Sequence, residues 1–229
     1  MGAVAESLKW LMNQLGYAVC HQLPERSLHY GGQKLPVCAR DTGFFLGFAA
    51  CLLVLLLFYR RDGDSYPSWR IVAVLAALVV PAILDAVSSY SGLRETTNAV
   101  RVVTGALAGT GVAALVFPIS CRQLFDPDDG IVVLERWWYL PALLMIPATV
   151  SLSLWPDWPG AYWLWAPLVS MSILFVLLVL NMTLLSLMID WLRQGARISC
   201  GDLACVAAAA ALVELVCANR LHWLVDRFF

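Results

Sequence analysis

The sequence predicts an all-α fold, a polytopic membrane helix bundle of about six transmembrane helices with an N-terminal amphipathic helix. Of its 229 residues, 61% are hydrophobic and 14% are charged, whereas soluble domains average about 45–50% and about 25%. The mean hydropathy is +0.75. Apolar stretches of about 20 residues recur, which is the length a helix needs to cross about 30 Å of hydrocarbon. Because unpaired backbone groups are costly in lipid, these stretches are expected to be helices.

The first 41 residues precede the first span and contain a candidate amphipathic helix over Ala5–Ala18. Its apolar residues recur at spacings of three and four, which predicts a helix lying in the membrane interface. A helix packed on the bundle is the alternative. The apolar positions are Leu8, Leu11, Leu15 and Ala18.

Six spans follow, and with the first 41 residues they are expected to form one membrane domain over residues 1–229. The connection SLWPDWPGAYW, between the fourth and fifth spans, is typical of an interfacial turn because it is rich in Trp and Pro. In the third span, Gly105 and Gly109 are four residues apart, which favours close approach of another helix. The predicted spans are 42–59, 69–88, 99–120, 137–154, 163–191 and 203–225.

The net charge of −1 excludes the basic footprint of a nucleic-acid-binding protein. The expected partners are membrane lipids and an anionic small-molecule or lipid ligand. The oligomeric state stays open.

An even number of spans separates the N-terminal segment from the 89–101 connection, so both are predicted on the same side of the membrane. The Lys and Arg residues are nearly balanced between the two faces. Four of the arginines lie among unusual polar residues. They are left out of this count because they are candidate site residues. The remaining basic residues favour both termini, and the polar segments beside them, outside the cytoplasm. The four arginines are Arg26, Arg40, Arg94 and Arg101.

The first polar cluster is CHQLPERSLHYGGQKLPVCARDTG, from Cys20 to Gly43. Its Pro and Gly residues interrupt any continuous helix and allow the chain to fold back. Two thiols, an imidazole and a carboxylate then form a candidate zinc ligand set. A disulfide between the two cysteines and two free thiols are the alternatives. The four candidate ligands are Cys20, His21, Cys38 and Asp41.

The second polar cluster is DAVSSYSGLRETTNAVRVVTG, from Asp85 to Gly105. Arg94, Asn98 and Arg101 fall at helical spacing and predict a polar stripe that enters the third span. Arginine binds phosphate and carboxylate groups in a bidentate manner, so the stripe suits an anionic head group or substrate. Asp85 is the expected ion partner of the stripe, and a purely structural ion pair is the alternative.

These two blocks resemble the signature of an uncharacterised family of small prokaryotic multi-span membrane proteins. That family is expected to carry CHQ-x-PERS and LPVCARCTG, followed by an Asp and an R-E/S-S/T-x-N-x-x-R-x-x-T-G pattern. The resemblance covers roughly Cys20–Gly109 and implies no activity. The residues that fall on motif positions of this family are Cys20, His21, Gln22, Arg26, Cys38, Arg40, Asp85, Asn98 and Arg101.

The chain departs from this pattern at Asp41, where the family pattern has a second cysteine of Cys-x-x-Cys. A carboxylate can replace a thiolate as a zinc ligand but cannot take part in a disulfide.

We therefore expect the two clusters to meet in one cavity at a membrane face. The first hypothesis is a membrane enzyme of a prokaryotic cell membrane, with zinc as its cofactor. Asp85 and His21 are its candidate catalytic groups, and an anionic or lipid-linked substrate binds Arg26, Arg40, Arg94, Asn98 and Arg101. The alternatives are a transporter or channel for a small solute or ion, and a structural subunit of a membrane complex.

Overall fold

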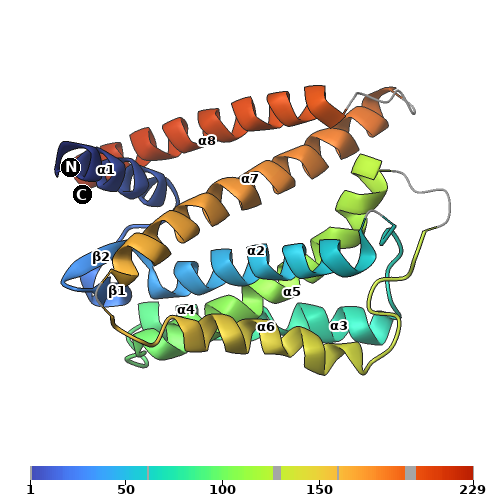
Figure 1. Cartoon of the computed structure of the whole chain (residues 1–229), viewed down its shortest axis with the longest axis horizontal. Helices are drawn as coiled ribbons and strands as arrows, with labels where there is room; N and C mark the ends of the chain where they lie inside the picture. The colour runs from blue at the N-terminus through green and yellow to red at the C-terminus, as the bar shows by residue number, and fades with distance from the viewer. Residues whose placement is uncertain (1, 61, 126–129, 159, 194–199, 229) are drawn as a thin grey trace.

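The computed structural model describes residues 2–60, 62–125, 130–158, 160–193 and 200–228. Its long helices run back and forth beside one another, and the two chain termini lie at the same end (Figure 1). The predicted all-α membrane bundle is confirmed. The helices are α1 Gly2–Val19, α2 Ala39–Tyr59, α3 Trp69–Ala77, α4 Val80–Tyr90, α5 Asn98–Phe125, α6 Tyr139–Ser153, α7 Ala161–Arg193 and α8 Cys200–Phe228.

Among the described residues, five helical segments are long and apolar enough to cross a membrane: α2, α3 with α4, α5, α7 and α8. The predicted fourth span is a helix, α6, but it has 15 residues. At about 1.5 Å per residue it is shorter than the hydrocarbon layer. The sequence estimate of six full-length spans is therefore corrected to five long segments and one short apolar helix.

The second span consists of two helices, because the helical ladder breaks after Ala77 and resumes at Val80. Pro81 follows this break. Proline has no N–H to donate, and its ring clashes with the carbonyl four residues earlier, which here belongs to Ala77.

Helices α2 and α5 are in backbone contact through glycines on both. A Cβ added at Gly105 would lie 2.0 Å from the Arg40 carbonyl oxygen, and one at Gly109 would lie 2.1 Å from that of Phe44. From the other side, a Cβ at Gly43 would lie 2.2 Å from the carbonyl oxygen of Val102. The close approach predicted from Gly105 and Gly109 is confirmed, and a matching small-residue surface on α2 completes it.

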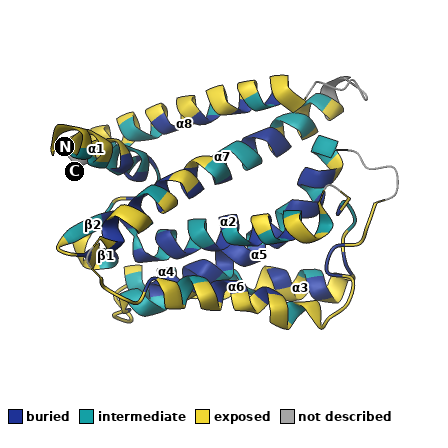
Figure 2. Ribbon diagram, viewed as in Figure 1, coloured by how far each residue is buried: buried dark blue, intermediate teal, exposed yellow. Residues whose placement is uncertain are grey.

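The core is centred on α5. Of the residues in its most apolar stretch, 67% are buried, compared with 22% for α8. Figure 2 shows this contrast, with α5 largely buried and α8 largely exposed along its outer side. The main apolar cluster joins α2, α3, α5, α6 and α7 through residues such as Phe48, Leu75, Phe117, Ile146 and Val176.

A short antiparallel hairpin, β1 (Ser27–Tyr30) and β2 (Gln33–Cys38), follows a 3-10 turn at Pro24–Arg26. Gly31 and Gly32 connect the strands with φ values of +54° and +76°. Two consecutive positive φ angles define the turn type that suits the twist of a two-residue hairpin. The sequence predicts only an irregular loop here, so the two-stranded sheet is an additional element.

Tyr30 fixes this hairpin to the rest of the bundle. Its side chain is 4% exposed, and its hydroxyl donates a hydrogen bond to the carbonyl of Leu154, at the end of α6. Burial, helped by the negative charge of Asp157, raises the pKa of Tyr30 to about 12. The hydroxyl therefore stays protonated and able to donate at physiological pH.

Helix α1 packs against α7, α8 and β2. Its contact face holds Met12 and Gly16, and a Cβ at Gly16 would lie 1.8 Å from the Pro36 carbonyl oxygen. Leu8 and Leu11 are exposed instead. The predicted helix is present and packs on the bundle, which was the alternative to a helix in the membrane interface. Of the predicted stripe, Ala18 is buried and Leu15 is half-buried.

Candidate metal centre and anion cavity

A cavity of about 230 Å³ lies at the end of the bundle that holds the hairpin and both termini. Its wall combines the N-terminal segment with the start of α2, the end of α4 and the start of α5. The two polar clusters therefore meet, as the parity of the spans predicted. The predicted site residues that line the cavity are Cys20, His21, Arg26, Cys38, Arg40, Asp41 and Arg101.

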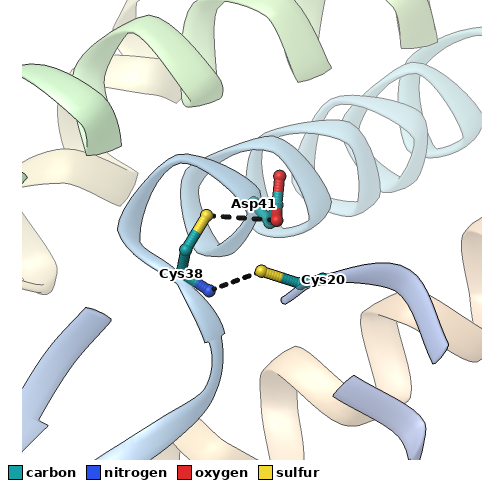
Figure 3. A group of neighbouring side chains, drawn as sticks. All are labelled: Cys20, Cys38 and Asp41. Atoms are coloured by element: carbon teal, nitrogen blue, oxygen red, sulfur yellow. Dashed lines mark hydrogen bonds between the residues drawn. The ribbon is translucent and has the colours of Figure 1, made fainter. Parts of the chain in front are cut away.

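Three candidate metal ligands converge in this cavity. The sulfur atoms of Cys20 and Cys38 and a carboxylate oxygen of Asp41 all lie within 4.8 Å of one another (Figure 3). The Cys38 thiol donates to Oδ2 of Asp41 at 3.1 Å. Cys38 immediately precedes α2, and Asp41 lies in its first turn, so the two face each other across the helix start.

The backbone orients the Cys20 sulfur toward this group. Cys20 is 7% exposed, and its Sγ accepts hydrogen bonds from the backbone N–H groups of Cys38 at 3.3 Å and Gln22 at 3.5 Å. Gln22 has a φ of +53°, and its side-chain amide donates to the carbonyls of Asn13 and Pro36. These contacts turn the chain directly after Cys20 and hold it against β2. The two N–H groups fix the position of this sulfur atom.

The spacing and chemistry of the three groups suit a zinc ion. Ligands of a tetrahedral zinc with Zn–S bonds of about 2.3 Å lie about 3.8 Å apart, so a contraction of about 1 Å at most would close the set. Both cysteines are free thiols in the structure. The hydrogen bond with Cys20, burial and the charge of Asp41 raise the pKa of the Cys38 thiol. Without a metal, that thiol is protonated at neutral pH.

His21, the fourth predicted ligand, does not join this group. Its ring instead lies 4.9 Å, centroid to centroid, from the ring of His222 on α8. Hydrogen bonds from two backbone N–H groups hold the Cys20 sulfur inside the cavity. The next residue, His21, is exposed at the rim of the cavity. The interpretation of His21 as a ligand of the same ion is therefore corrected.

Asp85 forms a buried ion pair, but with Arg40 rather than with the predicted stripe. Nε of Arg40 lies 3.1 Å from Oδ2 of Asp85, and Nη2 contacts the same oxygen. The Asp85 side chain is 3% exposed, and its Oδ1 has no hydrogen-bond partner among the described residues. The pair links α2 to α4. Asp85 does not line the cavity, but it contacts Arg40, which does.

Arg101 is the buried cation of the cavity. It is 8% exposed and donates to the Asn98 side-chain oxygen at 2.8 Å and to the Ser89 hydroxyl at 3.5 Å. Its Nε has no partner among the described residues, and the ion pairs found among them do not include it. Asn98 also donates to the Ser27 carbonyl at 3.1 Å, which joins α5 to β1.

Arg26 is held by an aromatic residue that the sequence analysis missed. Its guanidinium carbon lies 4.6 Å from the centre of the Tyr90 ring, at the end of α4. Ser89, the acceptor for Arg101, was also missed. One signal was available, because Asp85 and Ser89 are four residues apart and share a helix face.

Arg94 lies outside the cavity, and its place in the predicted stripe is wrong. Helix α5 begins at Asn98, and the Thr97 hydroxyl accepts a hydrogen bond from the Val100 N–H at 3.4 Å. A threonine in that role marks a helix start. Arg94 is therefore an exposed residue of the preceding connection, whereas Asn98 and Arg101 keep the predicted helical relation.

The fold and this cavity define the class: a polytopic α-helical membrane protein with a polar site at one end of its bundle. The chain belongs to the DUF2085 family, described as a predicted membrane protein, whose family model matches residues 20–115. The match begins at Cys20 and contains all the cavity residues named above.

Two archaeal relatives support this membership. An uncharacterized protein of Methanothermobacter thermautotrophicus is 35% identical over 98 residues, which are 42% of this chain and 83% of the relative. An uncharacterized protein of Methanocaldococcus jannaschii is 31% identical over 108 residues, which are 47% of this chain and 67% of the relative. No solved structure matches the chain.

Proposed function

We propose that this protein is a membrane-embedded zinc enzyme of a prokaryotic cell membrane that acts on an anionic, lipid-linked substrate. The convergence of Cys20, Cys38 and Asp41 within 4.8 Å, in the cavity that also holds Arg101, carries this proposal. A zinc ion with three protein ligands keeps a fourth position for water or a substrate oxygen and supplies a Lewis acid or a bound hydroxide.

The arginines of the cavity indicate that the proposed substrate is negatively charged. Arg101 and Arg26 line the cavity without an ion-pair partner among the described residues, whereas Arg40 is paired with Asp85. A buried guanidinium that lacks a carboxylate favours an anionic ligand, and phosphate groups match its planar donors. His21 lies exposed at the rim of the cavity.

The shape of the cavity favours an enzyme over a channel. Its lining residues all belong to one end of the bundle, and just below them α2 and α5 are in backbone contact through Gly43 and Gly105. No passage can run between these two helices. The cavity lies instead at the end of the bundle that holds the hairpin and both termini, which is where we propose that the head group of a lipid-linked substrate binds.

The test of the metal centre is zinc content after purification in detergent. We expect the Cys38→Ala variant to lose the zinc equivalent that the cluster binds, because two ligands bind zinc far more weakly than three. The Cys51→Ala variant is the matched control, because Cys51 is a fully buried thiol in the middle of α2. Equal zinc in the wild type and in Cys38→Ala, with both variants folded, would remove the cluster as a metal site.

We further propose that the cavity faces the outside of the cell. The test uses single cysteines introduced at two exposed positions in a background without native cysteines. His29→Cys lies in β1, beside the cavity, and Asp62→Cys lies in the connection after α2, at the opposite end. A membrane-impermeant maleimide should label His29→Cys in intact cells and Asp62→Cys only after permeabilisation. The reverse pattern would invert the proposed orientation.

A further inference from the structure

Two histidines from opposite ends of the chain meet beside the cavity. His21 follows α1, and His222 lies near the end of α8. Their ring centroids are 4.9 Å apart with an interplanar angle of 38°. Neither the sequence pattern nor the proposed zinc centre uses this pair, because His21 does not reach the cysteine cluster and His222 stands far from every motif.

The hydrogen bond of the His222 ring determines which tautomer the neutral ring adopts. Its Nδ1 lies 2.6 Å from the backbone carbonyl oxygen of Tyr17. A carbonyl can only accept, so Nδ1 carries the hydrogen, and Nε2 of the neutral ring has a free lone pair. A ring nitrogen that donates to a backbone carbonyl while the other stays free is the usual support of a metal-ligating histidine.

The position of His222 is fixed by further contacts with α1. The Tyr17 ring packs edge-on against the His222 ring, with 5.4 Å between centroids. One turn earlier on α8, the Asn219 amide donates to the Gln14 carbonyl at 3.2 Å. His222 is therefore held in place on a rigid helix before any ligand arrives, which lowers the entropy cost of binding.

The separation of the two rings matches two imidazoles bound to one ion. With metal–nitrogen bonds of about 2.0–2.1 Å and a tetrahedral angle, the ring centroids lie about 5 Å apart. The observed separation is 4.9 Å. His21 is exposed, so water can complete the coordination on the outer side. Imidazole nitrogen suits the borderline divalent ions, of which zinc is the common biological example.

We propose that His21 and His222 form a second metal site, separate from the cysteine cluster, that binds a borderline divalent ion such as Zn²⁺ through two imidazole nitrogens and water. This site joins the chain directly after α1 to the last helix. It does not depend on the proposed function, because it shares no ligand with Cys20, Cys38 and Asp41.

The experiment is a Zn²⁺ titration of the full chain in detergent, with a fluorescent zinc indicator as competitor. It uses the Cys38→Ala background, in which the cysteine cluster is disabled. We expect one equivalent of weak binding there, and at least a tenfold loss of affinity after either His21→Ala or His222→Ala. His29→Ala is the matched control, since His29 is an exposed histidine in β1, at the same end of the bundle, and it should leave the binding unchanged.

A purely structural role is distinguished by His222→Phe, which keeps an aromatic ring beside His21 and removes both nitrogens. The proposal expects this variant to lose the zinc equivalent while its melting temperature with a chelator stays near that of the parent. Unchanged zinc affinity in His222→Phe or in His21→Ala would overturn the site. Loss of the Cys38-dependent equivalent has no bearing on this result, so the two metal proposals fail separately.

Discussion

Replacing Gly105 with alanine is expected to lower the free energy of unfolding by about 3 kcal/mol or more, at the upper end of the range for overpacked positions. Alanine is the better helix former by up to about 1 kcal/mol, so helix propensity alone predicts the opposite sign. The added Cβ would lie 2.0 Å from the carbonyl oxygen of Arg40. That atom belongs to the backbone of α2 and can move away only if the two helices separate.

The measurement is thermal unfolding in detergent, followed by helical circular dichroism. Gly2→Ala is the control, because Gly2 is also helical and a Cβ there meets no atom within 4 Å. We expect it to leave the melting temperature unchanged. A Gly105→Ala variant as stable as the wild type would show that α2 and α5 are not in backbone contact.

Removing one partner of the Arg40–Asp85 pair is expected to cost about 3–5 kcal/mol, the range measured for uncompensated buried charges. Asp85→Ala leaves the Arg40 guanidinium, whose side chain is 15% exposed, without its carboxylate. The combined variant Arg40→Met/Asp85→Leu should regain most of that loss, because it leaves no unpaired charge. With the single variants Arg40→Met and Asp85→Leu, a double-mutant cycle gives the coupling between the two groups.

The exposed pair Lys9–Glu6 in α1 provides the comparison. Its atoms are 3.2 Å apart, and the Glu6 side chain is 74% exposed. Pairs of this kind contribute about 0–1 kcal/mol. Glu6→Ala should therefore change stability little. If Asp85→Ala were equally mild, Asp85 would not be a buried partner of Arg40.

Much of the fold was predictable because membrane spans are encoded locally. Each needs about 20 apolar residues, and the predicted segments match α2, α5, α7 and α8 within a few residues. The hairpin was also encoded locally, by Gly31-Gly32 between two short strands. The break before Pro81 has an equally local cause.

The site was predictable in composition but not in its pairings. The two motif blocks supplied Cys20, Cys38, Asp41 and Arg101, and the parity of the spans placed the blocks at the same end. Which atoms meet depends on packing between helices that are distant in sequence. Asp85 therefore pairs with Arg40 instead of the stripe, and His21 meets His222, a residue with no local signal.

The glycine contact between α2 and α5 has a consequence for how the cavity can respond to a ligand. Arg40 and Asp41 stand on one of these helices and Arg101 on the other, so their relative positions are locked by touching backbones. Cys20 belongs to a segment held mainly by the side chain of Gln22 and by α1. The cavity thus has one immovable wall, and any closure around an ion must come from residues 20–26.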